Sequence, residues 1–223
     1  MMDFAAARRM MVDGQVRTSD VTDLRIVAAM LELPRERFVP ETHAGLAYLD
    51  LDVPVLRAAP GEPPRRLLKP MVLAKMVQAA AIKASDRVLD VGCTTGYSSA
   101  LLARLAHDVV ALEQDSALAK LAGENLQAVG ASNATVVTGP LAEGYPPKAP
   151  YDVILVNGAS EIVPQKLCAQ LKDGGRLLVV FRRAPNGKAM VYRSVAGDVS
   201  GWPVFDAAAP LLPGFAEPPA FVF

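Results

Sequence analysis

The stretch that decides the fold is Val88-Leu-Asp-Val-Gly-Cys-Thr-Thr-Gly-Tyr97. It begins as a short apolar strand, passes through a tight loop of small residues and continues into a helix. Gly92 and Gly96 let the backbone approach a ligand closely, and the helix N-terminus offers free N–H groups. Such turns are also common without any ligand. The stretch therefore predicts a strand–turn–helix unit that is a candidate, and no more, for a binding site.

Strand and helix patterns alternate beyond this loop. The expected strands are 109–113, 135–138, 152–157 and 176–181, and the expected helices are 97–106, 116–129 and 163–171. Short, nearly continuous apolar strands separated by helices indicate a parallel sheet that is covered on both faces. Because crossovers are right-handed, the pattern predicts a doubly wound, Rossmann-like α/β sheet. Residues 190–195 and 203–206 predict an antiparallel strand pair that closes it.

The part of the chain before the loop predicts helices. One is expected over 4–16 with Asp3 as its cap, and a second begins after a cap at Thr22 and ends before Pro34. Pro70 suits the first turn of a third helix.

The proline-rich stretch Arg57–Arg66 predicts a loop that separates these helices from the sheet. We expect one domain over 1–223, in which 1–69 form a helical segment packed on the substrate side. Arg65, Arg66 and Lys69 form a small basic cluster beside the cleft that is expected to be solvated, with attraction of a carboxylate-bearing substrate as the alternative.

Composition limits the class of protein. Of the 223 residues 52% are hydrophobic, and 23 Lys and Arg balance 23 Asp and Glu, which argues against disorder and against a strong attraction to nucleic acid or membranes. No run of 18 apolar residues occurs, and 1–15 do not resemble a signal peptide. Two cysteines suggest a reducing compartment, so we expect a cytoplasmic protein. Two histidines without a CxxC pair predict no metal site.

An acidic residue and the loop itself suggest which ligand the cleft takes. Glu113 ends the next strand, 21 residues after Gly92, where a carboxylate can bind a ribose diol. Thr94 stands where a dinucleotide loop has its middle glycine, and Asp90 suits an amine-bearing ligand. The loop therefore favours S-adenosylmethionine over a dinucleotide, although a nicotinamide-dependent oxidoreductase stays open. Motifs for a P-loop or an α/β-hydrolase nucleophile are absent, and Cys93 is expected to be a packing residue.

Several segments together resemble the protein-L-isoaspartate O-methyltransferases. The segments that carry the resemblance are Met11–Val16, Pro34–Pro40, Ala47–Asp50, Val88–Gly96, Tyr151–Ile154 and Gln170–Leu178. The N-terminal ones are the specific part, since many methyltransferases share the glycine loop and the Gly-Gly-Arg strand. The resemblance covers residues 11 to about 180.

The resemblance implies a Rossmann-like methyltransferase that uses S-adenosylmethionine to methylate a protein or peptide carboxylate in protein repair. No nucleic-acid or membrane partner is expected, and the sequence leaves the oligomeric state open. The residues expected at the cofactor are Asp90, Gly92, Thr94, Thr95, Gly96, Tyr97, Glu113, Gln114, Gly139, Pro140, Leu141 and Asn157.

Three positions depart from the family pattern. Leu68 stands at the family's active-site serine, Thr94 at the central glycine of the loop, and Pro140 at the acid expected near the adenine. No catalytic residue is assigned. An alternative is therefore a degenerate member that binds the cofactor or a partner protein, with a different methyl acceptor or none.

Overall fold

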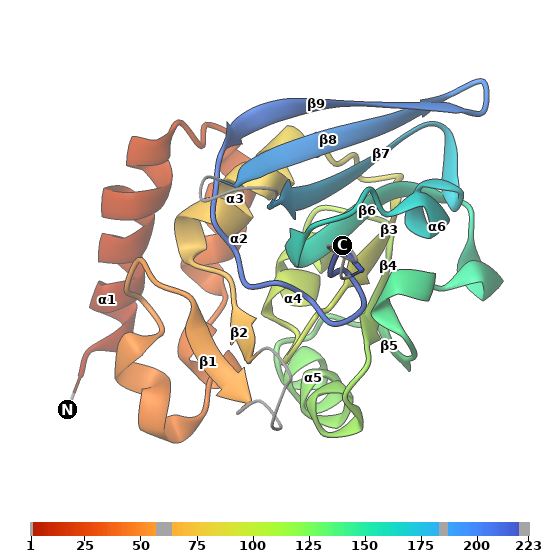
Figure 1. Ribbon diagram of the computed structural model, residues 1–223. Helices are drawn as coiled ribbons and strands as arrows, with labels where there is room; N and C mark the ends of the chain where they lie inside the picture. Colours follow the sequence, from red (N-terminus) through yellow and green to blue (C-terminus); the bar gives the residue numbers. More distant parts are fainter. Residues whose placement is uncertain (1, 57–63, 183–186, 219–223) are drawn as a thin grey trace, which may run out of the picture.

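A computed structural model of the chain describes residues 2–56, 64–182 and 187–218. Its centre is a seven-stranded sheet with the order β5-β4-β3-β6-β7-β8-β9 (Figure 1). The strands are β3 (Arg87–Val91), β4 (Asp108–Glu113), β5 (Ala134–Thr138), β6 (Tyr151–Ser160), β7 (Leu171–Phe181), β8 (Lys188–Val195) and β9 (Asp198–Asp206). The first five are parallel and the last two antiparallel, so the predicted fold class is confirmed.

The strand order reverses beside β3. The chain moves outward from β3 to β4 and β5 on one side, and then returns to β6 and β7 on the other. In doubly wound sheets ligands bind in the crevice at such a reversal, outside the carboxyl ends of the strands. The order of the strands thus fixes the candidate site at the ends of β3 and β6.

Both faces of the sheet are covered, and neighbouring residues of each strand point to opposite faces. Val88, Val109 and Val153 belong to a core shared with the N-terminal helices and with α4 (Tyr97–Ala103) and α5 (Ser116–Ala128). The core on the other face is shared with α6 (Gln165–Cys168) and with the segment after β9, and its strand members include Leu89, Val110 and Ile154.

The N-terminal helices form largely as expected. Asp3 caps α1 (Phe4–Met11) by accepting from the amides of Ala5 and Ala6, and a π-helical turn (Val12–Val16) continues it. The cap of α2 (Leu24–Glu32) is Asp23 and not Thr22, because the Asp23 carboxylate accepts from the Arg25 amide at 2.9 Å. α3 (Pro70–Ala79) begins at Pro70.

The proline-rich stretch is not a loop throughout. Residues 57–63 lie outside the described part of the chain, but Arg65 and Arg66 belong to a strand, β2 (Arg65–Leu67). It pairs antiparallel with β1 (Val53–Leu56), and Figure 1 shows this small sheet beside α4 and α5.

The helix expected over 163–171 is shorter than predicted. α6 covers Gln165–Cys168, and Leu171 is already the first residue of β7, where it pairs with Tyr151. The backbone follows the sheet here because Tyr151 donates its amide to Gln170 O at 2.8 Å.

After β9 the chain returns to the sheet. Residues 207–215, called the C-terminal segment below, run down to β6 (Figure 1), where Ala159 donates to Pro210 O and Leu212 donates to Ala159 O. Phe215 is 1% exposed, which fixes the segment in the second core.

One buried cluster joins the N-terminal helices to the sheet, from Ala7 to Ala209. The helices and the sheet therefore bury their apolar side chains against one another. Among the described residues no helix is long and apolar enough to cross a membrane.

Candidate functional site at the carboxyl edge of the sheet

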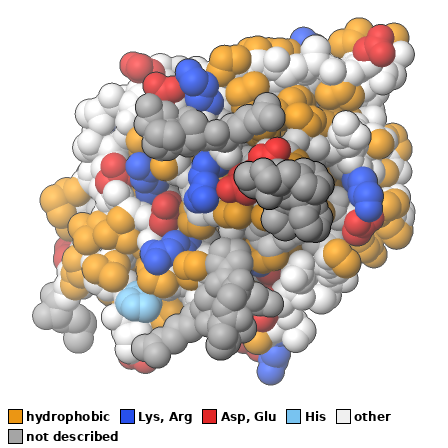
Figure 2. Space-filling view, in the orientation of Figure 1, with side chains coloured by type: hydrophobic (Ala, Val, Ile, Leu, Met, Phe, Trp, Pro, Cys, Tyr) orange, Lys and Arg blue, Asp and Glu red, His pale blue; other side chains and the backbone are white. Residues whose placement is uncertain are grey.

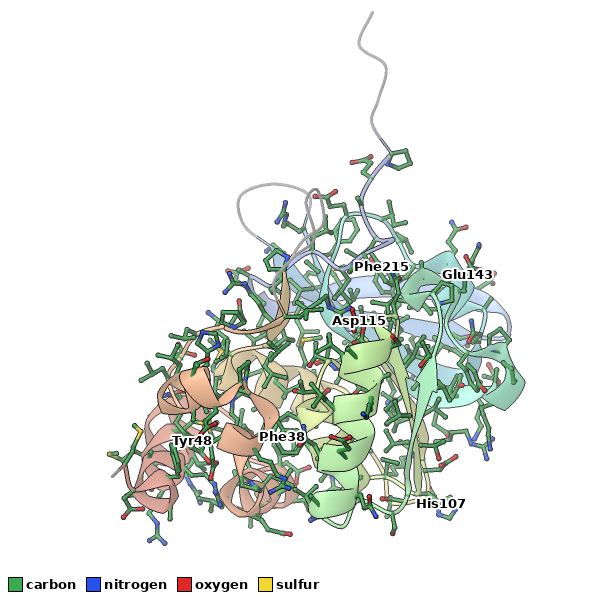
Figure 3. The ribbon with its side chains drawn as sticks, turned by 90° about the horizontal axis from the view of Figure 1, so that it is seen from below. Phe38, Tyr48, His107, Asp115, Glu143 and Phe215 are labelled. Carbon is green, nitrogen blue, oxygen red and sulfur yellow. The ribbon has the colours of Figure 1, made fainter. Side chains whose placement is uncertain are left out.

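The predicted ligand residues come together at one edge of the sheet. Gly92 follows β3, Glu113 ends β4, Gly139 follows β5, and Asn157 lies near the end of β6. In Figure 3 the labelled Asp115 and Phe215 lie at this edge, and His107 lies at the opposite one. The topology therefore assembles acids and glycines that the sequence spreads over 66 positions.

Asp90 is the buried acid beneath the glycine loop. Its carboxylate accepts from the hydroxyls of Ser98 at 2.7 Å and Ser99 at 2.5 Å, and from the Asn157 amide. Burial raises the pKa of Asp90 to about 7, although the two serine hydroxyls act in the opposite direction. Through these bonds Asp90 joins the start of α4 to β6.

Glu113 is fully buried and its oxygens are saturated. Arg65 pairs with it through two bonds, Nη1–Oε1 at 2.7 Å and Nη2–Oε2 at 2.8 Å. Three backbone amides also donate to it, from Thr94, Gln114 and Asp115. Arg65 is itself only 6% exposed. The expectation of a solvated Arg65 is therefore wrong, because this side chain turns inward to neutralise a buried carboxylate.

The glycines leave space that neighbouring parts of the chain fill. A Cβ at Gly92 would lie 3.2 Å from Leu212 Cδ1 and 3.3 Å from Arg65 Nη2, and one at Gly158 would lie 2.5 Å from Leu212 Cγ. A Cβ at Gly96 would meet the Ala122 backbone of α5 at 3.3 Å. Gly96 thus makes room for helix packing, and Leu212 lies against the open face of the loop.

Both threonines of the loop are buried and bonded within the chain. Thr94 has a φ of +52°, a left-handed conformation that favours glycine, and its hydroxyl donates to Cys93 O at 2.7 Å. The Thr95 hydroxyl donates to Phe38 O, which ties the loop to the N-terminal layer. Cys93 is fully buried, and burial raises the pKa of its thiol, so it is a packing residue as expected.

Leu68 lies in the interior. It is 3% exposed and lines a cavity of about 10 Å³ together with Arg35, Thr94, Tyr97 and other residues. A cavity of this size holds a single water at most.

Arg35 is a fully buried cation beside that cavity. Its guanidinium donates to Ala47 O and Leu68 O at 2.7 Å and lies 4.6 Å from the centre of the Tyr97 ring. Among the described residues Nη1 of Arg35 and the Tyr97 hydroxyl have no hydrogen-bond partner.

The remaining predicted residues lie around the same edge. Gln114 and Pro140 are exposed, and Leu141 is fully buried in the same cluster as Leu212 and Phe215. Gly139 donates its amide to Glu113 O at 3.1 Å.

Sequence reasoning missed Arg65 as the partner of Glu113, and it also missed Arg35, Ser98, Ser99 and Leu212. The two serines were within reach, since they follow the loop on the first turn of α4. Arg65 and Leu212 have no such signal, because they are 48 and 99 positions away from Glu113.

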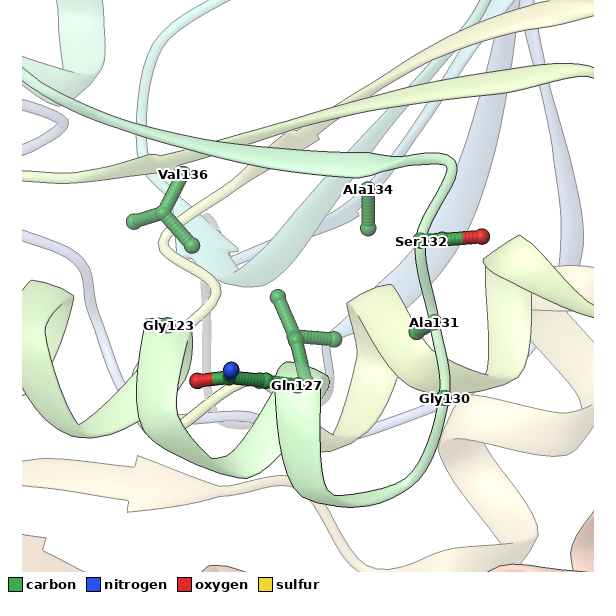
Figure 4. A pocket seen from close by; sticks show the side chains of 8 residues that line it. Gly123, Gln127, Gly130, Ala131, Ser132, Ala134 and Val136 are labelled. Carbon is green, nitrogen blue, oxygen red and sulfur yellow. The ribbon is translucent and has the colours of Figure 1, made fainter.

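Among the described residues, one wide hollow lies away from this edge. A groove of about 320 Å³ between α5 and β5 has no ionisable side chain in its lining (Figure 4). Figure 2 shows Lys and Arg side chains among hydrophobic ones near the middle of one face. Among the described residues, no group of three or more His, Cys, Asp or Glu is placed to hold a metal ion.

The reversed sheet, its antiparallel closing pair and the glycine loop at the reversal define a Rossmann-like methyltransferase. Comparison with known proteins gives the family. The model of the protein-L-isoaspartate(D-aspartate) O-methyltransferases matches residues 7–200, and the chain belongs to this family. It is 42% identical over 171 residues to a protein-L-isoaspartate O-methyltransferase of Methanoculleus marisnigri, a match covering 77% of this chain and 75% of that one. It is 37% identical over 194 residues to one of Koribacter versatilis, covering 87% and 85%.

Solved structures agree with the fold. A protein-L-isoaspartate O-methyltransferase superposes with a TM-score of 0.79 at 26% identity, covering 93% of this chain and 66% of that one. A Plasmodium falciparum structure, described as a member of the same family in complex with S-adenosyl-L-homocysteine, gives a TM-score of 0.73 at 16% identity. The family is one of S-adenosylmethionine-dependent methyltransferases, so the predicted class of enzyme is confirmed and the nicotinamide alternative falls away.

Proposed function

We propose that this protein is an S-adenosylmethionine-dependent carboxyl O-methyltransferase that acts on isoaspartyl residues of proteins or peptides. The observation that carries the proposal is the family match over residues 7–200, which includes the whole edge where Gly92, Glu113 and Asn157 meet. The N-terminal layer over this edge contains the family signature Pro34–Pro40, and Arg35 of that signature is buried against Tyr97.

The residue types at this edge suit a nucleoside cofactor, but in this structure other parts of the chain already contact them. Glu113 is a suitable acceptor for ribose hydroxyls, yet its oxygens are already saturated, and Leu212 covers the loop at Gly92. The cavity beside Thr94 and Leu68 is only about 10 Å³. When bound, the cofactor supplies an electrophilic methyl group.

The protein's own residues act on the carboxylate that accepts the methyl group. A substrate carboxylate is already ionised at neutral pH, because its ordinary pKa is near 4, and it needs no general base. What the protein must supply is orientation and the exclusion of water. Arg66 and Lys69 are half-buried cations next to Leu68, and their positive charge suits an anionic acceptor.

The test of the function is transfer of a radiolabelled methyl group from S-adenosylmethionine to a peptide. An isoaspartyl peptide should accept label well above its normal aspartyl twin, since the two differ only in which carboxylate is free. Equal labelling of both peptides, or of neither, would reject the isoaspartyl assignment.

A second candidate is a family member without methyl transfer, which binds a partner protein. The departures at Leu68, Thr94 and Pro140 favour it, and so do the pairing of Arg65 with Glu113 and the position of Leu212 against Gly92. Binding of S-adenosylhomocysteine without transfer to any carboxylate peptide would support this candidate over the first.

The compartment we propose is the cytoplasm. Cys93 and Cys168 are buried free thiols, which suits a reducing environment. We also propose a protein or peptide substrate and no nucleic-acid partner, in line with the balanced charge.

A further inference from the structure

The carboxylate that should receive the ribose is already fully used. Glu113 accepts five hydrogen bonds on its two oxygens, two of them from Arg65 in a fork that is almost completely shielded from water. A paired fork between Arg and a carboxylate is among the stronger interactions in proteins, and removing one partner leaves a buried charge. A diol can therefore reach Glu113 only by displacing one of these five donors, of which Arg65 supplies the two that come from a side chain.

A second, apolar group covers the same place from the other side. Leu212 lies within 3.2 Å of the Cβ position of Gly92 and within 2.5 Å of that of Gly158, so it occupies the space that both glycines keep open. It is held there by backbone, since its amide donates to Ala159 O at 3.0 Å. Leu212 is 4% exposed and belongs to the same cluster as Leu141 and Phe215.

The two groups come from parts of the fold that can move without breaking the central sheet. Arg65 lies on the small β1–β2 sheet, which is separate from the seven-stranded one. Leu212 lies on the C-terminal segment, which is not a strand of either sheet and is held beside β6 by the isolated bridge between Ala159 and Leu211, by backbone hydrogen bonds and by the burial of Phe215. Neither residue takes part in the pairing of β3 with β4 and β6.

We propose that Arg65 and Leu212 form an internal plug that occupies the nucleoside half of the cleft and competes with the cofactor. This inference rests on the proposed function, because it concerns the same site and adds its regulation. Cofactor binding then requires that Arg65 leaves Glu113 and that the C-terminal segment moves off Gly92 and Gly158. Only molecules in which the plug is open can bind the cofactor. The measured dissociation constant is therefore the intrinsic one divided by the open fraction.

The experiment is titration calorimetry of the full chain with S-adenosylhomocysteine, comparing the wild-type protein with Arg65→Ala and Leu212→Ala. We expect each variant to bind at least ten-fold more tightly. For Arg65→Ala, one charge-assisted hydrogen bond no longer competed for corresponds to a factor of about that size, and for Leu212→Ala so does the apolar side chain that the ligand no longer has to displace. The matched control is Arg87→Ala, which removes an arginine from another Arg–carboxylate pair, with Asp108 at 3.1 Å, at the opposite edge of the sheet. Its affinity should stay within two-fold of the wild type.

Folding of each variant is checked by thermal unfolding followed by circular dichroism. If Arg65→Ala does not fold, Arg65→Lys, which keeps the charge but loses the fork, and Leu212→Ala carry the test. Unchanged or weaker binding in the folded variants overturns the plug, and so does the absence of binding in all of them.

Methyl transfer to the isoaspartyl peptide separates this inference from the proposed function. Tighter binding in the variants without any transfer supports the plug and rejects the function. Transfer by the wild-type protein, with an affinity that the substitutions do not raise, supports the function and rejects the plug.

Discussion

At the scale of single residues, the position with the most chemical consequence is Leu68. A hydroxyl at the family position can orient an acceptor, whereas this leucine packs in the interior beside Thr94 and Tyr97. Because Leu68 is only 3% exposed, a hydroxyl placed there would lie in the interior. Restoring serine therefore does not by itself restore the site.

We predict that Leu68→Ser lowers the free energy of unfolding by about 2–5 kcal/mol, because it removes a buried leucine and buries a hydroxyl. Isoaspartyl methylation should stay at the wild-type level. The measurements are urea denaturation and radiolabel transfer, with Leu68→Ala as the control for lost volume. A ten-fold gain of transfer in the serine variant over the alanine variant would contradict the prediction.

Asp90 gives a prediction for pH. Burial raises its folded-state pKa to about 7, above the ordinary value of 3.8, so the folded protein keeps a proton that the unfolded chain releases. Its contribution therefore makes the protein less stable as the pH rises from about 4 to about 7, and is constant above that range.

Asp90→Asn should remove this dependence. The quantity to compare is the free energy of unfolding of the wild-type protein minus that of the variant. This difference should fall by a few kcal/mol as the pH rises from about 4 to about 7. Denaturant titrations at intervals of one pH unit measure it. Parallel curves for the two proteins would show that Asp90 is ionised at the same pH in both states.

How far the sequence predicts the site also depends on single residues. Gly92, Glu113 and Asn157 could be placed, because each follows or ends a strand whose position the apolar pattern indicates. Arg65 could not, since nothing in a proline-rich stretch specifies which of two adjacent arginines turns inward. That choice is made by the register of β2, in which Arg65 and Leu67 are buried and Arg66 is half-buried.

At the scale of elements, the N-cap residues show how the local sequence determines where a helix begins. Asp115 accepts from the amides of Ala117 and Leu118, both at 2.9 Å, and so starts α5 directly after Glu113. The amides of Gln114 and Asp115 also donate to the Glu113 carboxylate. The same short segment therefore starts the helix and binds the buried carboxylate.

We predict that Asp115→Ala lowers the free energy of unfolding by about 1 kcal/mol, within the usual range for a lost N-cap. Asp115→Asn keeps a side-chain oxygen that can accept these hydrogen bonds, so it should lose much less stability than Asp115→Ala. Gln127→Ala, an exposed substitution on the same helix, should change stability by less than about 0.5 kcal/mol. Chemical denaturation provides all three values, and a loss in Gln127→Ala equal to that in Asp115→Ala would contradict the capping role.

The elements that sequence reasoning missed are the short ones. β1 and β2 have four and three residues, and such lengths carry too little alternation to be recognised. The helix expected over 163–171 is longer than α6 because the apolar residues of α6 continue into β7. Only the pairing of Leu171 with Tyr151 determines where the strand begins. In both cases the boundary depends on a distant strand, so local sequence cannot supply it.

At the scale of the whole molecule, the N-terminal helices and the sheet share one core. Met11, Met30 and Phe38 are at most 1% exposed and belong to the same buried cluster as Val88 and Val153 of the sheet. Arg176 on β7 also donates to Ala80 O and Ala81 O at the end of α3 and pairs with Asp86 at 2.8 Å. Separating the two parts would expose apolar surface and break the hydrogen bonds from Arg176 to the end of α3.

The whole chain should therefore unfold in one transition. Trp202, the only tryptophan, lies half-exposed on β9 at the edge of the sheet, so its fluorescence reports on the strand farthest from β5. Far-UV circular dichroism reports mainly on the helices, several of which lie before residue 80. Urea midpoints from the two probes should coincide, as they do for a single cooperative unit. A helical signal lost at lower urea than the fluorescence change would show that the N-terminal layer is a separate folding unit.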